Sequence, residues 1–251
     1  PYTDRESALA ERQVVRFVDL ANAGLTNFPA WPAELPHLSR LSLRNNALGE
    51  LPEALGNLTG LTWLDLGETA IVTLPEALGK LDKLETLYLS DNQLTSLPAA
   101  IGSLSSLAYL NADRNNLMEL PPQLGRLQEI KWLRLNGNKL ASLPPSIGGL
   151  TKLRRLYLND NRLTDLPMSL AALDRLTDLS IGGNPLKKAP DCISELSALE
   201  RLDMDRCGLE TIPESMAQLS RLQWLRLEGN NLSQDERRRI EQLLPECQVI
   251  F

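Results

Sequence analysis

The amino-acid sequence predicts an α/β solenoid, in which short parallel strands and helical returns stack as repeated units. The main observation is a phrase, L-x-x-L-x-L-x-x-N-x-L-x-x-L-P, that recurs every 23 residues over residues 15–232, with no insertion or deletion. Repetition at such a fixed period is the signature of repeat architectures. Aromatic residues make up only 4% of the chain, so the predicted core is aliphatic. Two flanking segments, residues 1–14 and 233–251, fall outside the repeat and are predicted to cap the stack, because a solenoid exposes its core at both ends.

The first apolar position of the phrase numbers the ten units. It falls on Val15, Leu38, Leu61, Leu84, Leu107, Ile130, Leu153, Leu176, Leu199 and Leu222. The short L-x-L centre of each unit alternates apolar and polar residues, as in Leu41 and Leu43, which predicts a strand with one buried face. Positions four and six should therefore point inward, and the strands of successive units should pair side by side.

Position nine holds an asparagine in seven units, and it marks the point where the chain leaves the sheet. Buried backbone groups at this turn need partners, and an inward amide can both donate and accept hydrogen bonds. Thr69 and Cys207 stand at this position in two units and can supply part of that role, whereas Ala23 in the first unit cannot. The asparagines are Asn46, Asn92, Asn115, Asn138, Asn161, Asn184 and Asn230.

A Leu-Pro pair then opens the return segment, as in Leu51-Pro52. Proline is tolerated at the start of a helical turn, so a short helical return is predicted after it. A following L/I-G-x-L pattern, as in residues 55–58 and 147–150, supplies further core leucines. The recurrent glycine indicates a tight backbone geometry.

Both flanks predict a capping helix. Thr3-Asp4-Arg5-Glu6 fits a capping box, and Ala8, Leu9 and Val14 form its apolar stripe. Ser233-Gln234-Asp235-Glu236 fits a second one, before a helix with Ile240, Leu243 and Leu244 on one side. Pro245 should end that helix, and residues 247–251 are predicted to form a final edge strand. The alternative is that either helix binds a partner.

On these motifs the chain resembles the leucine-rich-repeat family, in its 23-residue LPxxLGxLxxLxxLxLxxN form. Intracellular Ras-group scaffolds and bacterial effector domains share that form. The resemblance implies a right-handed, horseshoe-shaped solenoid with the parallel sheet on the concave face and short helical or 3-10 returns on the convex face. It also implies a protein-binding activity. The flanks lack the cysteine-rich character of extracellular members, which favours an intracellular location, either native or after delivery into a host cell.

Positions three, five and seven should face the concave surface, because strand side chains alternate. Most of the few aromatic residues fall there, on adjacent strands that together span roughly 20 Å. Tryptophan, tyrosine and arginine are enriched at binding hot spots, so this band is the candidate partner-binding site. The alternative is that the rings only cover neighbouring strand backbone. The candidate residues are Trp63, Tyr88, Tyr109, Trp132, Arg134, Arg155 and Tyr157.

Charges alternate in the C-terminal part of these columns. Arg155, Asp178 and Arg201 follow one another at position three, and Asp203 and Arg226 do so at position five. Opposite charges on neighbouring strands stabilise a sheet modestly, so we interpret this as a self-neutralising ladder, with a charged docking site as the alternative. A metal at Asp203 and Asp205 is not expected, because arginines lie close by.

The sequence predicts no catalytic site, no cofactor, no metal site and no small-molecule substrate. The single histidine, His37, is expected at a turn, and the three cysteines form no zinc-ligand pattern. A net charge of −6 argues against binding to nucleic acid or an anionic membrane. No stretch approaches the ~20 apolar residues of a membrane helix.

Two hypotheses of function follow, a protein-binding module or scaffold and a substrate-recognition arm of a larger enzyme. A start at Pro1 suggests a piece of a longer protein, and related bacterial repeat proteins carry a ubiquitin ligase or kinase domain outside the repeats. Catalysis within the repeats is a third, disfavoured hypothesis.

Overall fold

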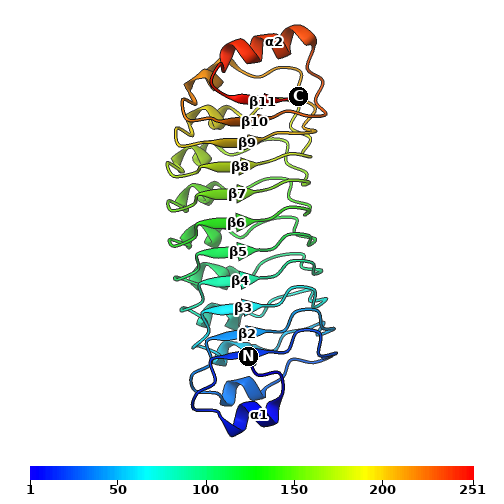
Figure 1. The fold of residues 1–251 in the computed structure, drawn as a ribbon, viewed down its shortest axis with the longest axis vertical. Helices are drawn as coiled ribbons and strands as arrows, with labels where there is room; N and C mark the ends of the chain where they lie inside the picture. The colour runs from blue at the N-terminus through cyan, green and yellow to red at the C-terminus, as the bar shows by residue number, and fades with distance from the viewer.

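The computed structural model describes residues 1–251 and contains one parallel sheet of eleven strands in sequential order (Figure 1). Each strand pairs with the next one in the chain, so the N-terminal and C-terminal caps lie at opposite ends of the stack. This confirms the predicted solenoid fold. The strands are β1 Phe17–Asp19, β2 Arg40–Ser42, β3 Trp63–Asp65, β4 Thr86–Tyr88, β5 Tyr109–Asn111, β6 Trp132–Arg134, β7 Arg155–Tyr157, β8 Asp178–Ser180, β9 Arg201–Asp203, β10 Trp224–Arg226 and β11 Gln248–Ile250.

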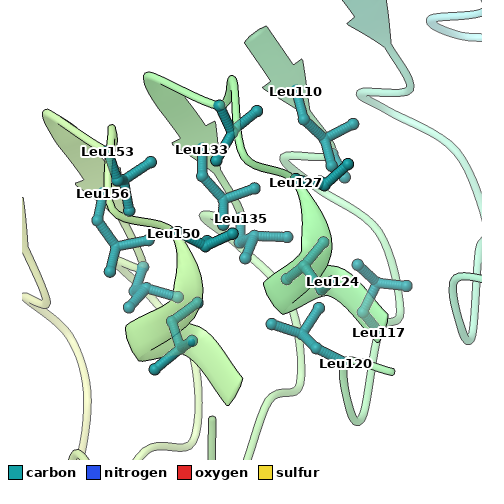
Figure 2. Close-up of a cluster of buried hydrophobic side chains, with 14 of the residues drawn as sticks. Leu110, Leu117, Leu120, Leu124, Leu127, Leu133, Leu135, Leu150, Leu153 and Leu156 are labelled. Atoms are coloured by element: carbon teal, nitrogen blue, oxygen red, sulfur yellow. The ribbon is translucent and has the colours of Figure 1, made fainter. Parts of the chain in front are cut away.

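The strands keep the register that the repeat predicts. Leu110 pairs with Leu133, and Leu133 pairs with Leu156, so equivalent positions of successive units face each other across the sheet. Positions four and six are buried throughout, in one hydrophobic cluster of 69 residues. In Figure 2 the strand leucines Leu133 and Leu135 point into the same interior layer as Leu124 and Leu127 from a return. The predicted alternation is therefore confirmed.

The predicted helical returns are 3-10 helices that lie behind the sheet. Each of η2 to η9 follows a proline, whose φ near −70° suits the entry to a helical turn. The residue before this proline is leucine for η2 to η7, Ala189 for η8 and Ile212 for η9. The returns are η1 Trp31–Glu34, η2 Glu53–Asn57, η3 Glu76–Lys80, η4 Ala99–Ser103, η5 Pro122–Arg126, η6 Pro145–Gly149, η7 Met168–Ala172, η8 Asp191–Glu195 and η9 Glu214–Gln218.

The asparagine at position nine forms the predicted buried ladder. The Asn138 amide nitrogen donates to the carbonyl oxygens of Ala112 and Leu135, both at 3.0 Å, and its oxygen accepts from the backbone N–H of Leu117 at 3.0 Å. One side chain thus joins its own turn to the preceding unit. Because these atoms are buried, the amide removes backbone groups that would otherwise lack partners.

The recurrent glycine of the returns is required by close packing between units, and its φ is not positive. A β-carbon at Gly56 would lie 2.7 Å from the carbonyl oxygen of Ala77 in the next return. At Gly125 it would lie closer still to the carbonyl oxygen of Ser146. Ala171 occupies the equivalent position in η7, so the chain itself tolerates a β-carbon at that level of the stack.

Gly125→Ala is expected to lower the free energy of unfolding by about 1–3 kcal/mol, because the new methyl group forces two returns apart. Urea unfolding measures the change. Ala171→Gly is the matched control, and it should shift stability by less than Gly125→Ala does. An equal or smaller cost at Gly125 would contradict the packing argument.

The N-terminal cap differs in detail from the prediction. Helix α1, Arg5–Ala10, is capped by Asp4, which accepts a hydrogen bond from the N–H of Ser7, so Thr3 is not the capping residue. Val14 is 63% exposed and does not join the apolar stripe, because the chain turns there and buries Val15 instead. Tyr2 adds an isolated parallel bridge to β1, a contact that the sequence did not reveal.

The C-terminal cap contains a longer helix and the expected edge strand. Helix α2, Gln234–Leu243, is capped by Ser233, whose hydroxyl accepts from the N–H of Glu236. Ile240 is fully buried against the last unit. Strand β11 then pairs with β10 in parallel and extends the sheet. The helix begins at Gln234, directly after its capping residue.

Candidate protein-binding face

Positions three, five and seven share the solvent-facing side of the sheet, which we call the open face. Polar side chains at position seven mostly form hydrogen bonds within the protein. Asp113 accepts from the N–H of Asn136 at 2.8 Å, Asn136 accepts from Asn159 at 2.9 Å, and Asn159 accepts from Gly182 at 2.8 Å. These polar side chains form a second ladder, so they serve the backbone. The sequence pattern did not reveal this ladder, because polar residues in that column fit binding and structure equally well.

Four of the predicted site residues form a continuous line of ring contacts, which we call the aromatic band. Ring centroids are 5.8 Å apart for Trp63 and Tyr88, 5.1 Å for Tyr88 and Tyr109, and 5.7 Å for Tyr109 and Trp132. The planes are tilted by 45–59°. Tilted rings at such separations attract each other beyond their area of burial. The structure therefore brings Trp63, Tyr88, Tyr109 and Trp132 together.

Tyr157 and the two predicted arginines continue this line by a different contact. The guanidinium carbon of Arg155 lies 4.4 Å from the ring centre of Trp132, and that of Arg134 lies 5.4 Å from the ring centre of Tyr157. Arg134 also pairs with the buried carboxylate of Asp113 at 2.6 Å. Both guanidinium groups are thus fixed by a ring on one side, within the range of a cation–π contact.

The line extends further toward the N-terminus than the sequence interpretation placed it. Arg40 lies between Phe17 and Trp63, with its guanidinium carbon 5.1 Å and 5.0 Å from their ring centres. Phe17 and Arg40 also stand at position three of their units, so the sequence pattern could have identified them. They were left out because the prediction followed only the densest run of aromatic residues.

The rings of the aromatic band are half-buried, with one exception. Trp132 is 39% exposed, which makes it one of the few large apolar side chains of the chain that solvent reaches freely. Burial raises the pKa of the Tyr109 phenol, since ionisation in this apolar setting is disfavoured. The rings do cover neighbouring strands, as the structural alternative expects. They also leave part of each ring exposed to solvent.

The charge ladder is present at position three but not at position five. Asp178 pairs with Arg155 at 3.7 Å and with Arg201 at 3.2 Å. Arg226, however, pairs with Asp205 at 2.7 Å and also with Glu228, so the expected pairing with Asp203 is wrong. The largely buried carboxylate of Asp205 is within reach of Arg226, and a charge-assisted bond there relieves its desolvation.

A hollow of about 400 Å³ opens on the open face over β7 to β10. Tyr157, Asp178, Ser180, Arg201, Asp203 and Trp224 are among its lining residues. Ser180 is the smallest of the lining residues and stands between Tyr157 and Asp203 in the position-five row. The sequence analysis did not predict this hollow, because a small residue such as Ser180 does not stand out among the residues of its position.

The cysteines and the histidine take structural or surface positions. Cys207 replaces the ladder asparagine, and its thiol contacts the carbonyl oxygens of Ile181 and Asp205 at 3.4 Å. Burial raises the pKa of Cys192 and Cys207 to about 11, which leaves both thiols protonated near neutral pH. His37 is exposed. No cluster of three or more histidine, cysteine or acidic side chains is placed to hold a metal ion.

A stack of short units with one exposed sheet face is typical of protein-interaction modules of the leucine-rich-repeat class. Sequence comparison agrees, because the leucine-rich repeat region family matches residues 7–115 and 99–185. The chain therefore belongs to the leucine-rich-repeat family. None of the curated proteins matches it. None of its helices has the length and apolar character needed to cross a membrane.

Solved structures of several kinds resemble the chain. The leucine-rich-repeat domain of the type III effector XopL is 28% identical with a TM-score of 0.76, over 87% of this chain and 78% of that one. A Leptospira interrogans leucine-rich-repeat protein is 25% identical with a TM-score of 0.54, over 100% and 99%. The ectodomain of the Arabidopsis thaliana receptor kinase GASSHO1/SCHENGEN3, solved with CASPARIAN STRIP INTEGRITY FACTOR 2, is 32% identical with a TM-score of 0.75. The match spans 87% of this chain but only 27% of that ectodomain.

Proposed function

We propose that this chain binds a partner protein on the open face of its sheet, with the aromatic band as the centre of the contact. The observation that carries the proposal is the continuous contact of Trp63, Tyr88, Tyr109 and Trp132, continued by the stacked Arg155. A contiguous apolar patch of this kind usually marks an interaction site. The rings and the guanidinium are already held in place, so a partner has little side-chain motion to restrain on binding.

The partner-binding residues proposed here are Trp63, Tyr88, Tyr109, Trp132, Arg134, Arg155 and Tyr157. The relatives that were solved as complexes support a protein or peptide ligand. The GASSHO1/SCHENGEN3 ectodomain was solved with CASPARIAN STRIP INTEGRITY FACTOR 2, and the receptor kinase HAESA with the peptide hormone IDA and the co-receptor SERK1. We carry over only the class of ligand to this chain.

Replacing both Tyr109 and Trp132 by alanine is expected to weaken capture of the partner by at least roughly 30-fold, since the loss of even one aromatic hot spot costs about 2 kcal/mol or more. The measurement is affinity capture from cell lysate with identification by mass spectrometry, followed by a titration of the captured protein. Met168→Ala is the control, because Met168 is 62% exposed but lies in the return η7 behind the sheet.

Thermal unfolding of the double variant separates loss of binding from loss of structure. A folded double variant that captures the partner as well as the unchanged chain would contradict the proposal. Loss of capture by Met168→Ala alone would move the binding site to the return side of the stack.

A second candidate function is substrate recognition for a larger effector enzyme, of the ubiquitin ligase or kinase type. The likeness to the repeat domain of a type III effector favours it. Under this candidate the chain acts intracellularly after delivery into a host cell, and catalysis belongs to a domain outside these residues. Sequencing the coding region on both sides decides the question, because an adjoining catalytic domain is required.

A further inference from the structure

The hollow over β7 to β10 has a row of three aligned residues at its centre. Tyr157 pairs with Ser180 across β7 and β8, and Ser180 pairs with Asp203 across β8 and β9. All three stand at position five and point to the same face. The small serine therefore leaves open space between Tyr157 and Asp203, which stand on strands two spacings, roughly 9–10 Å, apart.

The Asp203 carboxylate is held at this position by hydrogen bonds from two uncharged donor groups. One oxygen accepts from the N–H of Asp205 at 3.0 Å, and the other accepts from the side-chain nitrogen of Asn159 at 3.3 Å. The carboxylate reaches across β8 because Gly182 has no side chain there, and a β-carbon at Gly182 would lie 3.0 Å from the Asp203 oxygen. Lone pairs of both oxygens remain free, since a carboxylate can accept about four bonds.

No arginine or lysine of the chain forms an ion pair with Asp203, although arginines are close. Arg201 is bonded to Asp178 at 3.2 Å and lies over the Trp224 ring at 4.6 Å. Arg226 is occupied by Asp205 and Glu228. The charged groups at this end of the face are therefore paired apart from Asp203. Burial raises the pKa of Asp203, and this effect outweighs the lowering by the hydrogen bond from the N–H of Asp205 and by nearby Arg226.

The chain itself shows what a ring and a carboxylate in this arrangement bind. On the β6 side of Tyr157, Arg134 lies over the ring at 5.4 Å and pairs with the Asp113 carboxylate at 2.6 Å. On the β8 side, Ser180 leaves the ring without such a cover. A guanidinium stacked on the ring lies within about 6 Å of the ring centre and reaches a carboxylate oxygen about 2.8 Å away, so both contacts can form within two strand spacings.

We propose that this hollow receives an arginine side chain of the partner protein, with its guanidinium stacked on Tyr157 and paired with the carboxylate of Asp203. The inference rests on the proposed function, since it names the chemistry of one anchor in the same partner. A planar guanidinium stacks and pairs at the same time, which an ammonium group does not. The open face would thus bind a partner that presents an apolar surface to the aromatic band and a basic side chain to the hollow.

The probe is N-acetyl-L-arginine N-methylamide, titrated into the full chain while amide and indole shifts are followed by NMR. We expect saturable shifts at Ser180, Asp203 and the Trp224 indole, and none from the uncharged citrulline analogue. The lysine analogue should bind about tenfold more weakly, since it loses the stacked bidentate geometry. Equal shifts from citrulline, stronger shifts from N-acetyl-L-glutamate N-methylamide, or no shift with arginine would each overturn the proposal.

Two variants test the proposal without unfolding the chain, because each introduces a residue that already stands at the equivalent position of another unit. Asp203→Asn should remove the arginine-dependent shifts but keep the fold, because Asn111 accepts the equivalent N–H bond at position five of β5. Ser180→Tyr should fill the gap and also abolish binding, and tyrosine already stands at this position in β4 and β7. Asp65→Asn is the matched control, since Asp65 makes the same bond to Gly67 at 2.8 Å but lies outside the hollow.

The outcome separates this inference from the proposed function. Neither Tyr109 nor Trp132 lines the hollow, so their double variant should still bind the arginine probe. Failure of the probe with capture still dependent on Tyr109 and Trp132 overturns only the arginine anchor. If the probe binds at the hollow but the Tyr109 and Trp132 double variant captures the partner normally, only the proposed centre of the contact is overturned.

Discussion

Leu135→Ala is expected to lower the free energy of unfolding by about 2–5 kcal/mol, as large-to-small changes in a close-packed core do. Leu135 stands at position six of its unit, is fully buried and belongs to the continuous cluster of 69 residues. Figure 2 shows it between the strand leucines and those of the return. Alanine leaves a cavity that neither layer can close, because each is tied to its neighbours by the 23-residue register.

Urea denaturation of the two proteins measures this loss, and Met118→Ala is its control. Met118 is also apolar but 59% exposed, so its replacement should cost no more than about 0.5 kcal/mol. A loss below about 1 kcal/mol at Leu135 would mean that adjacent units relax into the cavity, contrary to the rigid stacking argued here.

Asn138→Ala is expected to cost about 3 kcal/mol or more, since it leaves several buried backbone groups without partners. The amide serves the N–H of Leu117 and the carbonyl oxygens of Ala112 and Leu135. Each buried group left unpaired costs about 1–3 kcal/mol. Because the bonds join two units, the loss should uncouple neighbouring units as well as loosen one turn.

Thr69 provides the comparison for this experiment, because it stands at position nine of its own unit. Its hydroxyl donates to the carbonyl oxygen of Leu66 at 2.7 Å, as the Asn138 amide does to Leu135. Its side chain does not accept a backbone N–H from the preceding unit, as Asn138 does from Leu117. Asn138→Thr should therefore cost less than Asn138→Ala. Equal costs would show that the carbonyl bonds of the amide contribute nothing, which would refute the ladder as a source of stability. Hydrogen exchange at Leu117 reports the loss directly.

Most of the architecture could be predicted because its causes are local and repeat. Alternation at the L-x-L centre predicts a strand, the proline after it predicts a return, and an unbroken 23-residue step predicts parallel strands in register. Errors occurred where the repeat ends. The choice of Asp4 over Thr3 as a cap, and the exposure of Val14, depend on how one helix meets one unit, and no second copy of the pattern supports them.

The site could be predicted only as a column of residues. The sequence by itself determined which side chains share the open face, since the strand period and the repeat step fix this, and it put aromatic residues next to one another. The tertiary structure decided what each does there. The polar side chains at position seven accept hydrogen bonds from the backbone of the next unit. Arg226 pairs with Asp205, and the Asp203 carboxylate has no ion-pair partner beside the hollow at Ser180. These outcomes depend on side-chain reach and on competition between neighbours three to five ångströms apart, at the scale of one strand spacing, and a one-dimensional pattern contains no such distances.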